Sequence, residues 1–342
     1  MNFIWKYMNK FVIFRFSYQK CKSMKRRDFV RVAAATAPML TVFPAGLAGM
    51  ERKLTAGKIE KRVLGKTGVM LSMIGFGGIV VRDAPPETAA ERVKMAIDRG
   101  INYFDVAPSY GDAEIKLGPA LEPYRKDVFL ACKTQKRTRV EAKAELEQSL
   151  RNLRTDHFDL YQHHAVTTLE DVDILLGPGG AMEAFLEARN EGKIRFIGFS
   201  AHSVEAAMAL MNRFDFDTIL FPFNFATWNA GNFGPQVFAR ASEKNMGILA
   251  LKSMAKGPWP QGADRSKYPK CWYEPLTSDE DILMGLRFTL SHPITAAVPP
   301  GDENLFKKAL TLADKIKPLR KSEIQLIKEK AQSGPPLFSY SA

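Results

Sequence analysis

The sequence predicts an α/β protein, namely a (β/α)8 TIM barrel with a short N-terminal β-hairpin. After residue 58 of the 342-residue chain, short apolar runs alternate with segments of helical periodicity. The apolar runs are continuous rather than alternating, as expected for strands covered on both faces. Eight such strands, separated by helical segments over about 250 residues, are typical of a closed barrel.

The predicted strands are short runs rich in branched and aromatic residues. They cover residues 73–77, 101–105, 128–133, 158–162, 194–199, 218–223, 247–252 and 294–298. The segments with helical spacing between them include residues 87–100, 140–156, 179–193, 203–214 and 279–293. A hairpin within residues 61–77 leads in, with "GKTG" (65–68) at its turn. The alternative is a doubly wound open sheet, which normally has a glycine-rich phosphate turn after its first strand, and "GFGG" (75–78) is not followed by a convincing helix start.

The formal net charge of +12 is concentrated at the N-terminus. Nine of the 49 Lys and Arg residues fall in residues 1–48, against one acidic residue, so the rest of the chain is nearly neutral and nucleic acid is not expected as a partner. Residues 24–48 begin "MKRRDFVR", continue without charge from Val32 and resemble a twin-arginine signal peptide. We therefore expect export by the twin-arginine machinery, to the periplasm of a bacterium, with an N-terminal membrane anchor as the alternative. Residues 1–23 are interpreted as an upstream extension before a start at Met24.

The barrel is predicted to cover residues 59–315, followed by a C-terminal helix and tail at 316–342. Residues 256–280, rich in proline and aromatic residues, form a predicted long loop at the barrel mouth that shapes a substrate pocket. Cys132 and Cys271 are expected to be isolated buried thiols, because two cysteines make no disulfide framework and show no metal-type spacing. No metal site is expected.

Polar residues fall at the carboxyl ends of three predicted strands or in the loops after them. Asp105 ends one strand, Lys133 ends the next, and Tyr110 follows Asp105 by five residues. The next strand leads into His163 and His164, and successive strand residues point to opposite faces, so only one of these histidines can face a central cavity. In a barrel such strand ends converge on one cavity, where active sites are built.

These residue types suit the reduction of a carbonyl group. A carboxylate and an ammonium at neighbouring strand ends can pair, and the ammonium favours the ionised form of a nearby phenol, which makes the phenol a better proton donor near neutral pH. A histidine can hold the carbonyl oxygen against the phenol. Each residue also has a structural interpretation: Asp105 and Lys133 as a buried ion pair, Tyr110 as a loop aromatic, and the histidines as core or rim residues.

Three segments together resemble the aldo-keto reductase family: "GINYFDVAPSYGDAEIKLGPAL", "DVFLACKT" and "DLYQHH". The resemblance covers roughly residues 60–310. It implies that the catalytic residues are Asp105, Tyr110, Lys133 and His164. In the family the histidine stands five residues after the aspartate of the "DLY" strand, which is Asp159 here. The resemblance thus implies that His164 faces the cavity and His163 the surrounding layer.

The resemblance also implies a nicotinamide dinucleotide, NADP(H) or NAD(H), bound across the barrel mouth without a Rossmann turn. The residues expected to bind this cofactor are Asp105, Ser200, Leu251, Lys252, Gly257, Gly301 and Asn304. Several positions depart from the family pattern. Ala201 replaces an asparagine, Leu220 replaces a glutamine, and Leu251 replaces the aromatic residue that stacks on nicotinamide. Pro300 stands in place of the lysine that grips the adenosine 2′-phosphate, which removes the usual charge-based preference for NADPH.

We therefore expect an NAD(P)H-dependent oxidoreductase that converts a small-molecule aldehyde or ketone to an alcohol, with Tyr110 as the proton donor. The alternative is a barrel of the same fold that acts as a non-catalytic or weakly catalytic nucleotide-binding sensor or partner subunit. The altered nicotinamide contacts favour this alternative, whereas the intact set of four polar residues disfavours it. Metal-dependent hydrolysis at the histidine pair is not expected, because adjacent strand residues diverge.

Overall fold

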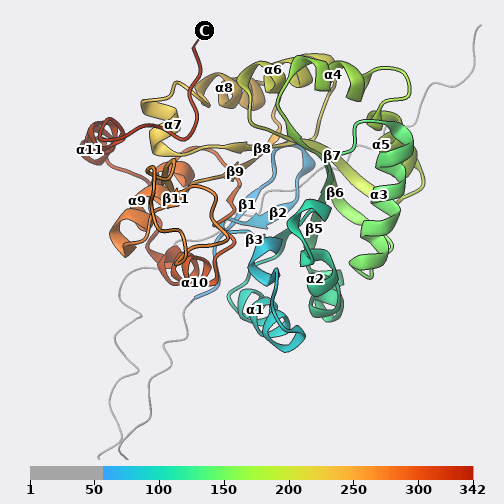
Figure 1. Cartoon of the computed structure of the whole chain (residues 1–342), viewed down its shortest axis with the longest axis horizontal. Helices are drawn as coiled ribbons and strands as arrows, with labels where there is room; N and C mark the ends of the chain where they lie inside the picture. Colours follow the sequence, from blue (N-terminus) through green and yellow to red (C-terminus); the bar gives the residue numbers. More distant parts are fainter. Residues whose placement is uncertain (1–56, 342) are drawn as a thin grey trace, which may run out of the picture. The chain divides into compact units, whose positions relative to one another are not determined.

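The central sheet is a closed parallel barrel. The computed structural model of the protein describes residues 57–341, so the predicted extension and signal peptide lie outside the described residues. Eight strands, all paired in parallel, follow the order β12-β9-β8-β7-β6-β5-β4-β3. A parallel bridge between Ile74 and Ala297 joins the two edges, where the Ala297 amide donates to the Met73 carbonyl at 2.9 Å. Helices surround the barrel (Figure 1), and the predicted fold is confirmed.

The barrel strands are short and almost entirely buried. Their bounds are β3 Phe76–Gly77, β4 Tyr103–Asp105, β5 Phe129–Thr134, β6 Phe158–Val166, β7 Ile194–Ala201, β8 Thr218–Pro222, β9 Gly247–Leu251 and β12 Ala296–Ala297. The strand β6 runs four residues beyond its predicted end at residue 162 and contains both histidines. Its pairing with β7 is irregular between His163 and Val166, where Ala165 takes a positive φ of 52°. The Ala165 amide donates to Ser200 Oγ at 2.9 Å and fixes this bulge beside His164.

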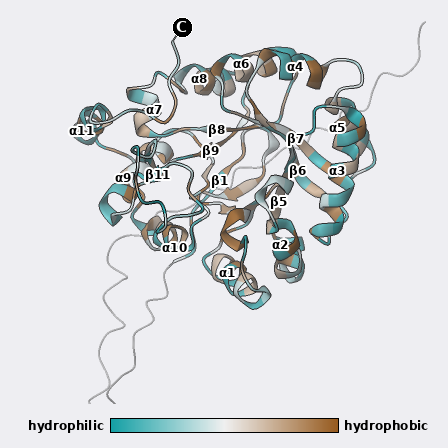
Figure 2. Cartoon of the chain, in the orientation of Figure 1, coloured by the Kyte–Doolittle hydropathy of each residue, from teal (hydrophilic) through white to brown (hydrophobic). Residues whose placement is uncertain are grey.

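The helices form the outer layer. Their bounds are α1 Pro86–Asp98, α2 Ala113–Leu121, α3 Arg139–Asn152, α4 Leu169–Leu176, α5 Ala181–Asn190, α6 Val204–Arg213, α7 Phe225–Asn229, α8 Pro235–Glu243, α9 Asp279–Leu290, α10 Glu303–Leu312 and α11 Lys321–Ala331. Several begin with a hydroxyl side chain that accepts a hydrogen bond from the amide three residues on, as Thr138 and Ser278 do. Figure 2 shows hydrophilic residues on the outward faces of these helices. None of the helices in residues 57–341 is long and apolar enough to span a membrane.

A separate apolar cluster fills the inside of the barrel, and the predicted hairpin closes its amino end. The hairpin strands β1 (Lys61–Val63) and β2 (Met70–Ser72) pair antiparallel, as predicted. Leu64 and Leu71 of this hairpin are fully buried in the same cluster as Leu220. Apolar side chains therefore fill the barrel below its mouth, and a ligand can enter only at the carboxyl ends of the strands.

The predicted long loop after β9 contains a small ribbon at the barrel mouth. Strands β10 (Ala255–Gly257) and β11 (Glu274–Pro275) pair antiparallel, and we call the intervening residues 258–273 the mouth loop. Lys270 of this loop donates to the carbonyl oxygens of Ile79 at 3.2 Å and Arg82 at 2.6 Å. These bonds tie the mouth loop to the segment that follows β3.

The C-terminal tail also packs against this end of the barrel. Phe338 stacks on Phe233 with ring centroids 5.1 Å apart and meets Trp272 of the mouth loop at 6.1 Å. The Tyr340 amide donates to the Gly231 carbonyl at 2.7 Å. The tail, although irregular, therefore belongs to the wall of the barrel mouth. Cys132 and Cys271 are both free and buried, as expected.

Candidate active site

Three of the four predicted catalytic residues meet directly at the barrel mouth. Lys133 on β5 is fully buried, and its Nζ donates to Oδ1 of Asp105, at the end of the neighbouring strand β4. The same Nζ lies 3.2 Å from the Tyr110 hydroxyl and 3.2 Å from the carbonyl oxygen of Val106. Tyr110 ends a short 3-10 turn, Pro108–Tyr110, in the loop after β4. Parallel pairing of β4 with β5 thus brings the carboxylate, the ammonium and the phenol together.

Two buried side chains that sequence reasoning missed hold the Asp105 carboxylate. The Tyr103 hydroxyl donates to Oδ2 of Asp105 at 3.1 Å, and Nε2 of Gln162 donates to the same oxygen at 3.3 Å. Tyr103 stands two residues before Asp105, and Gln162 two residues before His164. Since strand side chains repeat their direction every two residues, this spacing was the available signal. Together with Lys133, which bonds to the other oxygen, these donors hold the carboxylate by both of its oxygen atoms.

The two adjacent histidines point to opposite sides of β6, as expected. The His164 ring lies edge-on to the Tyr110 ring, with centroids 5.7 Å apart, and its Nδ1 lies 3.3 Å from Ser109 Oγ. His163 is fully buried in the outer layer, where it stacks on Phe185 at a centroid distance of 4.1 Å. Burial lowers the pKa of His163 to about 3 and lowers the pKa of His164 well below 6.5. Both rings are therefore neutral at pH 7.

Arg137 supports the backbone that carries His164. Its guanidinium donates to the carbonyl oxygens of His164 at 3.1 Å and Ala165 at 3.3 Å, and its Nε donates to Asp171 at 3.0 Å. The arginine is thereby anchored to the start of α4 while it holds the bulge of β6. This residue too was missed by sequence reasoning, because it lies in a loop remote from the histidine along the chain.

The electrostatics of Tyr110 correct one expectation. Burial lowers the pKa of Lys133, but Asp105 and Tyr110 raise it more, so the ammonium stays charged. Lys133 was expected to make Tyr110 more acidic, and it does act in that direction. Burial of the phenol outweighs this effect, and Asp105 also opposes it, so the pKa of Tyr110 is raised above 10.0. The phenol is therefore protonated throughout the neutral range.

One cavity at the barrel mouth brings together four of the residues predicted to bind the cofactor. Its lining consists of Gly77, Ile79, Asp105, Tyr110, Leu251, Lys252, Lys270, Trp272, Tyr273, Val298, Pro299, Pro300 and Gly301. Ser200, Gly257 and Asn304 do not line it. Ser200 instead accepts the hydrogen bond that fixes the bulge of β6. A Cβ atom on Gly257 would lie 2.8 Å from the carbonyl oxygen of Pro335, so the C-terminal tail covers that glycine.

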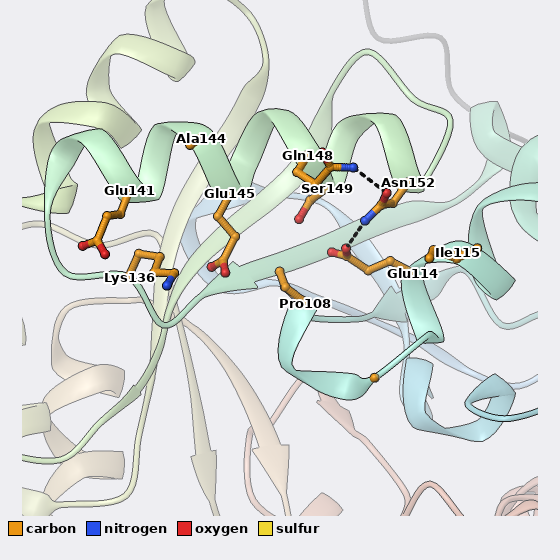
Figure 3. Close-up of a pocket in the computed structure, with 11 residues that line it drawn as sticks. Pro108, Glu114, Ile115, Lys136, Glu141, Ala144, Glu145, Gln148, Ser149 and Asn152 are labelled. Atoms are coloured by element: carbon orange, nitrogen blue, oxygen red, sulfur yellow. Dashed lines mark hydrogen bonds between the residues drawn. The ribbon is translucent and has the colours of Figure 1, made fainter.

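A second groove lies in the helical layer, between α2 and α3 (Figure 3). Glu114 is buried at its base, where its carboxylate accepts hydrogen bonds from Asn152 Nδ2 at 2.9 Å and from the Cys132 thiol at 3.4 Å. The acid is thus engaged in holding α2, α3 and β5 together. Across the part of the chain that the structure describes, no group of three or more His, Cys, Asp or Glu side chains is placed to hold a metal ion.

A phenol and a carboxylate line one cavity at the barrel mouth, with an ammonium and a histidine next to the phenol, and this combination is typical of oxidoreductases that act on carbonyl groups. The sequence profile of the Aldo/keto reductase family matches residues 73–311, and the chain belongs to this family. The family uses NAD(P)H to act on small-molecule carbonyl compounds, so the protein is an NAD(P)-dependent oxidoreductase.

Individual relatives agree with this placement. The chain is 26% identical over 276 residues to "Uncharacterized oxidoreductase YqkF" of Bacillus subtilis (strain 168), covering 71% of this chain and 87% of that protein. It is 29% identical over 171 residues to L-galactose dehydrogenase of Arabidopsis thaliana, covering 46% of this chain and 53% of the dehydrogenase. The holo form of the aldo-keto reductase AKR11C1 from Bacillus halodurans superposes with a TM-score of 0.65 at 22% identity, covering 83% of this chain and 98% of that one. This last likeness shows the fold.

The residues of the mouth cavity fit the reactive end of a nicotinamide cofactor. Leu251 offers an apolar surface for a flat ring, and Tyr110 and Asp105 line the same cavity. Gly301 also lines the cavity, and a Cβ atom there would lie 2.2 Å from a side-chain carbon of Ile79, so only glycine fits against this isoleucine. Of the residues predicted to bind the cofactor, Asp105, Leu251, Lys252 and Gly301 are the ones that would hold it from this cavity.

Proposed function

We propose that the protein reduces an aldehyde or ketone to an alcohol, with Tyr110 as the proton donor. The observation that carries this proposal is the position of the Tyr110 hydroxyl, 3.2 Å from the Nζ atom of a buried lysine that is bonded to Asp105. The phenol also borders the mouth cavity, where a carbonyl compound can reach it. A purely structural ion pair needs only the carboxylate and the ammonium. The phenol beside the ammonium therefore favours a role in proton donation.

Each side chain has a distinct task in this mechanism. NAD(P)H, when bound, supplies the hydride to the carbonyl carbon. Tyr110 gives its hydroxyl proton to the carbonyl oxygen, and the charged Lys133 stabilises the phenolate that remains. Asp105 keeps Lys133 protonated and in position. The neutral His164, edge-on to Tyr110, is placed to donate a hydrogen bond that holds the carbonyl oxygen beside the phenol.

The test is the loss of turnover when the phenol is removed. We expect Tyr110→Phe to lower kcat/KM by about 10²–10⁴-fold in assays that follow the absorbance of NADPH and NADH with a panel of aldehydes. Tyr124→Phe, at a half-buried tyrosine in the 3-10 segment Glu122–Asp127 after α2, is the matched control and should keep full activity. Nucleotide binding without turnover, unaffected by Tyr110→Phe, would instead identify a sensor or partner subunit.

We also propose that residues 24–48 direct export through the twin-arginine pathway. The support is the sequence "MKRRDFVR" followed by an uncharged segment. Changing both Arg26 and Arg27 to lysine should abolish export while the total amount of protein stays the same. Cell fractionation with an antibody against the barrel measures this, and export that survives the double substitution would contradict the proposal.

A further inference from the structure

The ammonium of Lys252 is caged at the barrel mouth without an anionic partner. Lys252 follows β9 directly and takes a positive φ of 64°. Its Nζ lies 4.9 Å from the ring centroid of Trp272 and 4.7 Å from that of Tyr273. Among residues 57–341 it makes no hydrogen bond and no ion pair, although the other lysines around the mouth do. Lys133 binds Asp105, and Lys270 binds two backbone carbonyls.

The charges around Lys252 leave an excess of positive charge in the cavity. Asp105 is the one carboxylate in the cavity lining, and it is bonded to Lys133. Burial, together with Lys133, lowers the pKa of Lys252 to about 8, and Cys271 opposes this shift only in part. The two aromatic faces offset part of the cost of removing the ammonium from water. They do not neutralise its charge, so a ligand that brings an anion would gain a charge-assisted hydrogen bond.

The position of Lys252 relates this unpaired charge to the proposed reaction. Lys252 and Tyr110 line the same cavity. Burial lowers the pKa of His164 and of His202, and the positive charge of Lys252 acts in the same direction on both. The ammonium and the Tyr110 phenol, which would give its proton to the carbonyl oxygen, therefore border one space. Trp272 packs against the ammonium and, with 55% of its surface exposed, offers an apolar face to the rest of a substrate.

We infer that the natural substrate is a carbonyl compound that also carries a carboxylate, held by the caged ammonium of Lys252 while its carbonyl group meets Tyr110. This inference rests on the proposed function, because it names the substrate class of the same site. The pyrophosphate of the cofactor is the other anion that Lys252 could meet, and the sequence analysis assigned the residue to the cofactor. If Lys252 binds the substrate, it affects the KM for the carboxylate-bearing substrate. If it binds the cofactor, it affects the KM for NADPH.

A matched pair of substrates separates these assignments. 4-Carboxybenzaldehyde and methyl 4-formylbenzoate differ in a single charge at the end remote from the aldehyde. In Lys252→Met, which keeps an unbranched apolar stem within the cage, we expect kcat/KM for the acid to fall about 10- to 100-fold while the ester and the KM for NADPH stay unchanged. Lys256→Met is the control, because Lys256 is exposed, pairs with Glu274 at 2.7 Å and lies four residues away. It should behave as the parent does.

Equal losses for acid and ester, or a raised KM for NADPH, would overturn the inference and return Lys252 to the cofactor. A parent enzyme that does not prefer the acid to the ester would overturn it as well. If neither aldehyde turns over, the proposed function fails separately, and titration of 4-methylbenzoate by calorimetry then decides the anion site. Binding to the parent that weakens at least tenfold in Lys252→Met supports the site, and equal or absent binding in both removes it.

Discussion

Replacing His163 with leucine should make the protein more resistant to acid. His163 is fully buried, stacked on Phe185 with an interplanar angle of 9° and edge-on to Phe216 at 6.1 Å. Neither of its ring nitrogens has a hydrogen-bond partner in the structure. A proton on this ring would place an unpaired charge between two phenyl groups, so the fold accepts only the neutral imidazole.

The size of the effect follows from the two pKa values. The folded pKa is about 3, against 6.5 for the unfolded chain, so the unfolded state binds the proton more tightly. The resulting contribution to stability is complete above pH 6.5 and is lost as the pH falls from 6.5 towards 3. At pH 5 the ring is mostly protonated in the unfolded chain and neutral in the fold. His163 alone should then reduce the free energy of unfolding by about 2 kcal/mol relative to pH 7.

Urea denaturation at pH 7 and pH 5 measures this difference. The loss of stability between the two pH values should be about 2 kcal/mol smaller in His163→Leu than in the parent. Any packing change caused by leucine affects both pH values and cancels in the comparison. His157→Gln, at a half-exposed histidine bonded to Asp156, serves as the control. If His163→Leu loses as much stability as the parent, proton exclusion at this ring is not the cause of acid sensitivity.

Three further predictions concern the active site. Tyr103→Phe should lower the free energy of unfolding by about 2 kcal/mol, because it removes a buried donor to the Asp105 carboxylate; urea midpoints equal to those of the parent would contradict this. With methyl 4-formylbenzoate, kcat/KM should stay level up to about pH 9, because burial keeps the pKa of Tyr110 above 10 and the phenol protonated; a fall near pH 8 would show that another group carries the proton. With 4-carboxybenzaldehyde, kcat/KM should instead fall as the pH rises through about 8, because Lys252 then loses its charge; this fall should be absent in Lys252→Met. The neighbours that face Lys252, including Lys133 and the neutral His164, keep their charge states through this range.

The fold and the meeting of Asp105 with Lys133 and Tyr110 could be predicted without coordinates for a simple reason. Strands covered on both faces must be continuously apolar, and parallel strands of a barrel all end at one face. Polar residues at the ends of two consecutive strands therefore had to be neighbours. The alternation of strand side chains likewise showed that only one of the two histidines can face the mouth, and the resemblance to the family indicated that this is His164. The same rule, applied two residues further back, would have identified Tyr103 and Gln162.

The sequence by itself thus determined the barrel, the convergence of its polar strand ends and the opposite directions of the two adjacent histidines, because these follow from periodicity along single segments. Only the tertiary structure decided how burial competes with charge, which is why the pKa of Tyr110 is raised although an ammonium lies beside it. It also decided that Trp272 and Tyr273 enclose Lys252, some twenty residues earlier in the chain, and that the C-terminal tail covers Gly257. Such contacts depend on how irregular loops fold back over the barrel, and neither hydrophobic period nor strand order specifies that path.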